Sequence, residues 1–235
     1  MPRSFFDKNK LLEINYKEPT IRVKKNNIIS CEECGLYKHC NSPKMEASGE
    51  GRLGILIIAE APGAEEDLQG TQLVGRSGRL LREVLHLMDL DLDRDFWKTN
   101  AISCRPQNNK TPSILQINAC RNRVKEVIDK YKPKVIIPMG YTAMISLVGD
   151  KITGRIKGLS MTDWAGCIIP DQDYKCWICP TWHPSYIIRN EDGSENSVVK
   201  KQFINNIREA VKLAEKPFYT SNYLGDCIVI DKMEE

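Results

Sequence analysis

Residues 55–63 read Ile-Leu-Ile-Ile-Ala-Glu-Ala-Pro-Gly and carry the clearest structural signal in the chain. The first five residues form a continuous apolar run, and Pro62-Gly63 then mark a turn. A continuous apolar run, unlike an alternating one, is typical of a parallel strand that is buried on both faces. We therefore expect a buried strand over residues 55–59 that delivers Glu60 to a loop at its carboxyl end.

The segments that follow this strand alternate between helical and strand patterns. Apolar residues recur at helical spacing from Leu80 to Met88, with Ser77 as the expected N-cap. Thr111-Pro112 is a good start for a second helix, which places Cys120 on its inward face. The other expected elements are strands over 96–103, 135–139 and 177–181 and helices over 141–148 and 200–214. This alternation predicts an α/β fold, a three-layer α/β/α sandwich with a mainly parallel four-stranded sheet.

Composition limits the class of protein. Of 235 residues, 41% are hydrophobic and 28% are charged, which is ordinary for a globular protein. No apolar run approaches the roughly 20 residues of a membrane span, and no secretory signal is visible, so we expect a cytoplasmic protein without a membrane partner. Residues 1–30 carry seven Lys or Arg and three acidic residues. The expected organisation is a basic arm (1–30), one catalytic domain (31–215) and a C-terminal extension (216–235).

Nine cysteines are many for a reducing compartment, where a metal or cluster is the usual reason to keep several thiols. Two C-x-x-C pairs, Cys31 with Cys34 and Cys176 with Cys179, suggest a zinc site as one possibility. The second pair lies in an expected strand, where positions three apart point to opposite faces. That orientation disfavours zinc, and Cys40, Cys167 and Cys227 are expected to be ordinary thiols.

Polar residues gather in three loops, each of which follows an expected strand. The loops contain Glu60-Ala61-Pro62-Gly63, then Thr99-Asn100 with Cys104-Arg105-Pro106, and finally His183-Pro184-Ser185. Together with a Gly70–Gly75 loop and four suitably placed cysteines, this series resembles the family-four, iron–sulphur uracil-DNA glycosylases. The resemblance runs from about Cys31 to Ala214. It implies the fold of that family and hydrolysis of the N-glycosidic bond of uracil flipped out of DNA, which leaves an abasic site.

The resemblance also implies roles for particular residues. Asn100 matches the amide that reads the Watson–Crick edge of the base, and His183 matches the donor to the uracil O2 as the base leaves. Ala61 stands where other branches of the superfamily place a water-activating aspartate, so Glu60, Glu66 or backbone groups are left to orient water. The remaining positions that match the substrate pocket are Ala61, Pro62, Gly63, Glu66 and Leu73. The alternative for residues 65–67 is a helix N-terminus, where acidic side chains are favourable.

Further expectations concern DNA and the cofactor. Residues 185–189, which include Ser185, are expected to form a loop that enters the minor groove, with Tyr186 or Ile187 as the wedge. Arg105 and Arg189 are expected phosphate contacts. By the resemblance, Cys31, Cys34, Cys104 and Cys120 hold a structural [4Fe-4S] cluster. The expected partner is DNA, single- or double-stranded, and the expected state is a monomer.

The chain departs from the family in its second motif. Gln72 and Leu73 stand where the family has a proline and a phenylalanine that stacks on uracil, and Ala59 replaces a glycine. A leucine keeps apolar contact but loses the aromatic face. A glycosylase for a modified pyrimidine is therefore one alternative, and a catalytically weak DNA-binding module of a larger replication or defence system is another. We assign no function to the insertion over 158–175 or to the apolar run over 227–230.

Overall fold

The computed structural model describes residues 30–149, 160–189 and 194–218, and all structural statements concern these ranges. A five-stranded sheet lies at the centre, in the order β2-β1-β3-β5-β4. Neighbouring strands run parallel except for β4, which pairs antiparallel with β5 at the edge. The strands are β1 (Ile55–Ala59), β2 (Phe96–Asn100), β3 (Val135–Pro138), β4 (Ile169–Asp171) and β5 (Cys176–Ile178).

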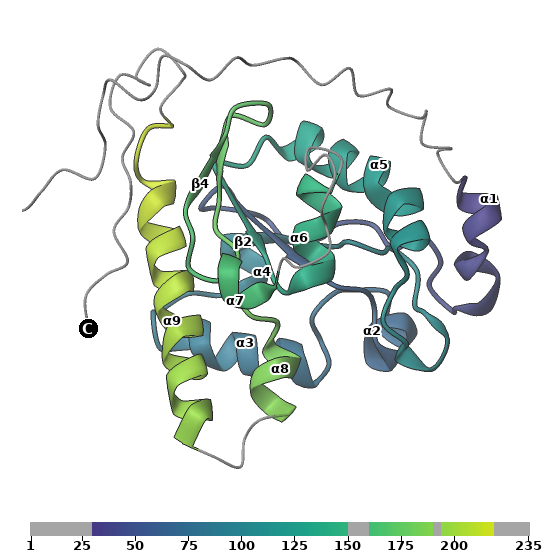
Figure 1. The fold of residues 1–235 in the computed structure, drawn as a ribbon, viewed down its shortest axis with the longest axis horizontal. Coiled ribbons are helices and arrows are strands. Elements are labelled where there is room, and N and C mark those ends of the chain that lie inside the picture. The colour runs from purple at the N-terminus through teal and green to yellow at the C-terminus, as the bar shows by residue number, and fades with distance from the viewer. Residues whose placement is uncertain (1–29, 150–159, 190–193, 219–235) are drawn as a thin grey trace, which may run out of the picture.

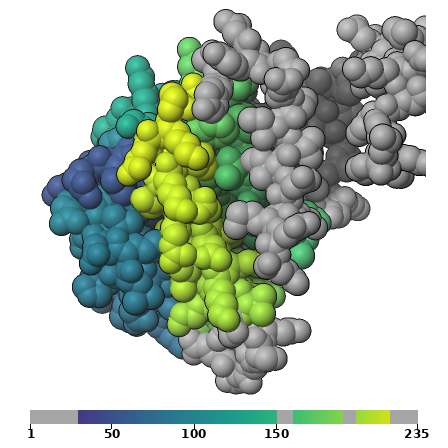
Figure 2. All heavy atoms as spheres, turned by 90° about the vertical axis from the view of Figure 1, so that its left-hand side faces the viewer, coloured from purple at the N-terminus to yellow at the C-terminus, as the bar shows by residue number. Residues whose placement is uncertain are grey.

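Helices cover both faces of this sheet (Figure 1). One face packs against α3 (Arg76–His86), α8 (Pro184–Arg189) and α9 (Ser194–Ala214), and α9 runs along the side of the molecule in Figure 2. The other face packs against α5 (Ile114–Tyr131) and α6 (Tyr141–Val148). The predicted three-layer α/β/α sandwich is therefore confirmed. Short helices complete the described chain: α1 (Cys31–Cys34), η2 (Leu36–His39), α2 (Ala64–Gln69), α4 (Leu92–Asp95), η3 (Gln107–Asn109) and α7 (Met161–Trp164).

The strand β1 confirms the pattern of a strand buried on both faces. Ile55 and Ile57 pack with α3 and α9, whereas Leu56 and Ile58 pack with α5 and α6. All four side chains are at most 2% exposed. Each such side chain stabilises the fold by roughly 1.5–3 kcal/mol through burial, so this strand holds the two helical layers together.

The register of the strands brings their carboxyl ends to one level. Ala59 lies opposite Asn100, and Ile58 lies opposite Pro138. β2 pairs with one side of β1, and the chain then returns so that β3 pairs with the other side. This reversal is a topological switch point, where ligands bind in open α/β sheets.

Several boundaries differ from the sequence prediction. The prediction of four strands misses β4, which arises from the 158–175 insertion and has no periodic pattern because it is only three residues long. The helix α3 is capped by Gly75 rather than Ser77, and α5 by Ser113, whose side chain accepts from the Gln116 N–H. The residues expected to form a DNA-entering loop lie in α8 instead. The apolar run over 227–230 lies outside the described residues.

No helix in the described ranges has both the length and the apolar character that crossing a membrane would require. The basic arm and most of the C-terminal extension fall outside these ranges.

A buried carboxylate joins the entry of β1 to the entry of β2. Asp95 is 0% exposed, and its two oxygens accept from Arg52 Nε at 2.6 Å and from Arg94 Nη2 at 3.0 Å. The Asp91 N–H donates to the same carboxylate at 2.8 Å. These donors, Arg94 first, hold the pKa of Asp95 far below its usual range. The carboxylate thus pins the start of the sheet.

We expect Asp95→Asn to lower the free energy of unfolding at pH 7 by roughly 1–3 kcal/mol, because charge-assisted hydrogen bonds at a buried site are lost. A depressed pKa stabilises the folded state above the unfolded value of about 3.9, and this contribution is lost as the pH falls through the folded pKa. The difference between wild type and variant should therefore shrink below about pH 4. Urea denaturation at several pH values measures it, and a pH-independent difference would contradict this explanation.

Candidate active site

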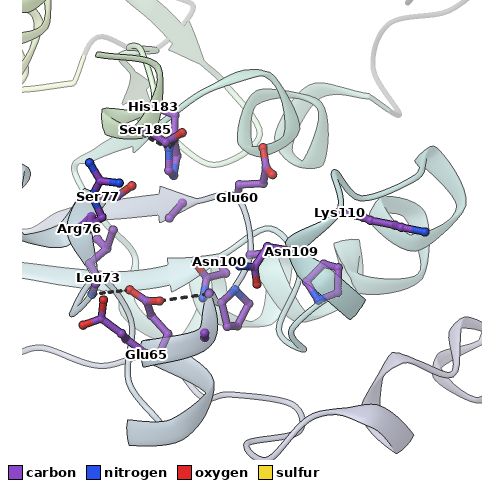
Figure 3. Close-up of a pocket in the computed structure, with 18 of the residues that line it drawn as sticks. Glu60, Glu65, Leu73, Arg76, Ser77, Asn100, Asn109, Lys110, His183 and Ser185 are labelled. Atoms are coloured by element: carbon purple, nitrogen blue, oxygen red, sulfur yellow. Dashed lines mark hydrogen bonds between the residues drawn. The ribbon is translucent and has the colours of Figure 1, made fainter. Parts of the chain in front are cut away.

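A cavity of about 370 Å³ opens at the carboxyl ends of β1 and β2 (Figure 3). Three segments line it: the loop after β1 with the start of α3, the end of β2 with the loop that follows, and the segment after β5. The structure brings together in this cavity ten of the residues predicted from sequence for the site: Glu60, Ala61, Pro62, Gly63, Glu66, Leu73, Asn100, His183, Ser185 and Arg189.

Asn100 is the last residue of β2 and is 3% exposed. Its side-chain Nδ2 has no hydrogen-bond partner among the described residues. A buried amide without a partner costs roughly 1–3 kcal/mol, so such groups are rare and call for an explanation. Because Asn100 also lines the cavity, its free N–H₂ group is available to a ligand there.

His183 is held in one orientation by Ser185, near the start of α8. Its Nδ1 lies 2.8 Å from Ser185 Oγ and accepts from the Ser185 backbone N–H at 3.2 Å. A ring nitrogen that accepts a backbone N–H carries no proton, so the proton of the neutral ring lies on Nε2. Burial, and secondarily the charge of Arg189, lowers the pKa of His183 to about 4. The side chain is therefore a neutral Nε2–H donor near pH 7.

A glycine allows this histidine to approach the sheet. Gly140 follows β3 with φ +87°, and its N–H donates to the Thr181 carbonyl at 2.8 Å. A Cβ at this position would lie 3.0 Å from the Cβ of His183. Any other residue would thus face both a strained backbone and a close contact, which fixes the distance between β3 and the His183 turn.

Glu60 directly follows β1, and it lines the cavity (Figure 3). The Thr142 hydroxyl donates to Glu60 Oε2 at 3.2 Å. Burial raises the pKa of Glu60, while the Thr142 hydrogen bond and the Arg189 charge oppose this effect. Glu60 therefore lines the same cavity as Asn100 and His183, and its carboxylate feels the charge of Arg189.

Glu66 lies at the N-terminus of α2 and binds three backbone N–H groups. Its Oε1 accepts from the N–H groups of Val74 at 3.1 Å and Gly75 at 2.7 Å, and its Oε2 accepts from the Gly63 N–H at 3.1 Å. The carboxylate thus caps α2 and clamps two cavity loops together. The alternative of a helix N-terminus is confirmed for this residue, and the prediction that it orients water is disfavoured because three backbone donors already occupy its oxygens.

The residues predicted to contact DNA divide into different environments. Ile187 is 1% exposed within the core, so its prediction as a wedge is wrong: α8 turns it inward. Tyr186 is exposed and stacks on Trp182 with ring centroids 4.9 Å apart. Arg105 turns toward the protein, donating to Asn109 Oδ1 at 2.9 Å and lying 3.9 Å from the Asp67 carboxylate. Arg189 lines the cavity itself.

The cavity also has a rim that sequence reasoning missed. It is lined by Arg76 and Ser77 at the start of α3, by Asn109 at the end of η3 and by Lys110 directly after it. The one sequence feature that could have indicated these residues is that they are polar and lie in loops that follow strands, and many loops share this feature. Only the fold shows that these loops meet.

A second cavity, of about 160 Å³, is lined by all four cysteines that the resemblance selected. Cys31 and Cys34 come from α1, Cys104 follows β2, and Cys120 lies on the inward face of α5. The Lys44 N–H donates to Cys104 Sγ at 3.2 Å. Burial raises the pKa of Cys104 to about 12 and also raises that of Cys120, so a positively charged group would be needed to keep these sulfurs ionised.

The donor set of the second cavity is four separate thiols, which a cluster could use. Within residues 30–149, 160–189 and 194–218, no three His, Cys, Asp or Glu side chains converge as ligands of one metal ion would. Separate thiols around one cavity suit a cluster, whose four sulfur ligands bind different iron atoms. Cys176 and Cys179 pack into the cores on opposite faces of the sheet, so they do not complete a zinc site with Cys31 and Cys34.

Comparison with known proteins agrees with this geometry. Residues 47–208 match the profile of the uracil DNA glycosylase superfamily. The chain is 34% identical over 167 residues to a type-4 uracil-DNA glycosylase of Pyrobaculum aerophilum, a match that covers 69% of this chain and 81% of that protein. It is 32% identical over 187 residues to a type-4 uracil-DNA glycosylase of Thermotoga maritima, covering 78% of this chain and 91% of the relative. A third such protein, from Saccharolobus solfataricus, is 28% identical over 200 residues, covering 85% of this chain and 89% of the relative.

The matched segment includes β1, β2, β3 and β5 together with Glu60, Asn100 and His183, so the similarity covers both the sheet and the cavity. With its three-layer fold, its cavity at the switch point and this similarity over most of its length, the chain belongs to the uracil-DNA glycosylase superfamily.

Proposed function

We propose that the protein is a DNA glycosylase that hydrolyses the N-glycosidic bond of uracil flipped out of DNA and leaves an abasic site. The observation that carries the proposal is the buried amide of Asn100, whose Nδ2 has no partner in the described part of the chain, in one cavity with the neutral imidazole of His183. An amide offers a donor and an acceptor, which the Watson–Crick edge of uracil requires. The relatives named type-4 uracil-DNA glycosylases support the same substrate.

In this reaction the bond between C1′ of the sugar and N1 of the base breaks, and its electron pair leaves with the base. Negative charge then grows on the uracil oxygens, and the Nε2–H of His183 is the donor that stabilises it. A neutral donor suits this step, because a cation here would also face the positive charge that develops on the sugar. Ser185 contributes by fixing the ring and its tautomer.

Glu60 is the carboxylate that faces the developing positive charge at C1′ and orients the attacking water. Since Glu66 is occupied by three backbone N–H groups, Glu60 is the carboxylate of the two that can take this role. Water adds its oxygen to C1′, and its proton is lost to solvent or to the departing base. Most of the rate enhancement then comes from charge stabilisation.

The DNA strand is held by the cavity rim. Arg189 and the exposed Tyr186 lie on α8 directly after the His183 turn and contact the strand next to the flipped nucleotide. Arg76 at the start of α3 and Lys110 after η3 also line the cavity and add positive charge to it. The catalytic domain spans residues 31–215 and acts as a monomer, with the basic arm over 1–30 adding nonspecific attraction for phosphate.

The second cavity holds a [4Fe-4S] cluster, with Cys31, Cys34, Cys104 and Cys120 as ligands. The four thiols around one cavity support this assignment. The cluster is structural: it joins α1, the segment after β2 and α5, which are distant in sequence. When bound, the iron would supply the positive charge that keeps these buried sulfurs ionised.

A second candidate substrate follows from Leu73, which lines the cavity as an aliphatic wall. An aliphatic wall contacts a base without the preference for a flat ring that an aromatic side chain would impose. A 5-substituted pyrimidine is therefore the alternative base, and the same assay distinguishes it from uracil.

We expect His183→Ala to slow release of uracil from a uracil-containing oligonucleotide by roughly 10²–10³-fold, the usual effect of removing one donor to a developing anion. Asn100→Ala should slow it as well, because the base loses its edge contact. Leu87→Ala, a substitution of a 73% exposed side chain at the end of α3, is the control that should keep the wild-type rate. The assay measures free base and abasic strand for uracil and for 5-substituted pyrimidines.

Each other outcome has its own meaning. Release confined to a 5-substituted base would favour the second candidate. DNA binding without release of any base would contradict catalysis and favour a binding module. An undiminished rate in His183→Ala would exclude the role given to that side chain.

The pH dependence of base release tests the electrostatics of the site. Since the pKa of His183 is about 4, the imidazole stays neutral through the neutral range, and no change in rate is expected near the ordinary histidine pKa of about 6.5. The pKa of Glu60 is raised, so its carboxylate becomes protonated at a higher pH than usual. As the pH is lowered, the rate should therefore begin to fall before the pH reaches 4.5. Single-turnover rates measure the profile. Glu60→Gln should be slow and lack this acid limb, and an inflection near pH 6.5 that disappears in His183→Ala would contradict the assignment.

Iron and acid-labile sulfide analysis of anaerobically purified protein tests the cluster. Wild type should carry about four of each per chain, and Cys104→Ser and Cys120→Ser should lose most of both. Their melting temperature should fall by at least about 5 °C, because a group that binds only the folded state stabilises it. Cys167→Ser, at an exposed site, is the matched control. Full iron content in Cys120→Ser would exclude that residue as a ligand.

A further inference from the structure

The wall of the base cavity has an unusual backbone conformation. Leu73 is 4% exposed, lines the cavity and has φ +57°. The left-handed region costs a residue with a side chain roughly 1–3 kcal/mol, so it persists only where surrounding contacts enforce it. The contacts on the two sides of Leu73 therefore determine where this wall stands.

The C-terminal side of Leu73 is held by Glu66 and by the backbone of α3. The Val74 and Gly75 N–H groups donate to Glu66, as noted above. The backbone of α3 also lies directly against the Leu73 carbonyl, since a Cβ on Gly78 would be only 1.8 Å from that oxygen. These contacts fix the wall against α2 and α3.

The N-terminal side is held by Gln72, which is 0% exposed. Its Nε2 donates to the Glu46 carbonyl, and its Oε1 accepts from the Ser48 hydroxyl at 2.6 Å. Both partners belong to the segment over residues 44–48, which we call the strap. A buried side chain with both ends of its amide bound has a single position, so Gln72 locks residue 73 to the strap.

The strap is in turn fixed to β2 and its continuation. Ser48 exchanges backbone hydrogen bonds with Lys98 at 3.0 and 2.7 Å, and Met45 N–H donates to the Ser103 carbonyl at 2.8 Å. Arg123 of α5 donates to the Lys44 carbonyl at 3.0 Å. Lys98 is two residues before Asn100 in the same strand, so the strap and Asn100 share one rigid support.

We propose that Gln72 is a positioning residue that sets the place of Leu73 relative to Asn100, and so determines how tightly a base is held between the wall and the edge-reading amide. The inference rests on the proposed function and deepens it. Gln72 does not contact the base: it acts through the Ser48 hydroxyl and the Glu46 carbonyl. Selectivity for the base, rather than affinity for the DNA backbone, is the property it controls.

The test compares binding of two strands that are identical except at one nucleotide. One carries uracil on a 2′-fluorinated sugar, which slows cleavage because fluorine disfavours positive charge at C1′, and the other carries an abasic residue. Gln72→Met keeps the size of the side chain and removes both hydrogen bonds. It should weaken binding to the uracil strand by roughly five- to tenfold, a loss of ~1–1.4 kcal/mol, and leave binding to the abasic strand within about twofold.

Ser48→Ala removes one of the two hydrogen bonds of Gln72, together with the contact between the Ser48 and Thr71 hydroxyls, and should give an intermediate loss of about two- to threefold. If Gln72→Met does not fold, the affinity ratio of Ser48→Ala still tests the positioning role of Gln72. The matched control is Asp91→Ala, which removes two side-chain hydrogen bonds that cap α4 at the opposite end of the sheet. It should lower stability to a similar extent without changing the ratio of the two affinities.

Hydrogen exchange of the amides over residues 71–75 gives a readout that needs no substrate. Exchange there should be faster in Gln72→Met than in wild type and unchanged in Asp91→Ala. An unchanged affinity ratio in both Gln72→Met and Ser48→Ala, or unchanged exchange over 71–75, would overturn the inference. A wild-type protein that binds both strands equally would instead count against the proposed function, and the exchange measurement would still decide the role of Gln72.

Discussion

The parallel register of β1 against β2 and β3 positions every group in the base cavity. Ala59 lies opposite Asn100, so the residue that follows β1, Glu60, leaves the sheet beside the amide that ends β2. The segment after β5 returns to the same edge through the bridge between Met139 and Thr181, which brings His183 over the opening. A shift of one residue would reverse the face on which each side chain lies and would separate these groups.

Burial at this edge gives the side chains their chemical character. Asn100 Nδ2 has no partner among the residues that the structure describes, and His183 is kept neutral; both arrangements carry a cost in stability. A base turned into the cavity would supply the missing partner and would benefit from a donor that needs no rearrangement. The buried core around β1 supplies the stability that permits these unsatisfied groups.

The two cavities are joined by short segments of chain. Asn100 lies in the base cavity and Cys104 lines the cysteine cavity, only four residues later. Ala61 borders the base cavity and also packs on the core that contains Cys104. The strap connects the same regions, because Lys44 donates to Cys104 while Ser48 binds Gln72. The walls of the cysteine cavity and of the base cavity are thus built from the same segments of chain.

The sequence by itself determined the local elements and selected the main candidate site residues. Apolar runs and helical spacing depend on neighbouring residues, so they predicted β1, α3, α5 and the loops that carry Glu60, Asn100 and His183. The tertiary structure alone decided the edge strand β4, the burial of Ile187, the clamp made by Glu66, the His183 tautomer and the contacts of Gln72. The reason is that each of these depends on a specific close contact, and the contact between Gln72 and Ser48 joins residues 24 positions apart. Periodicity reports which face of an element is buried, but not which atoms meet across it.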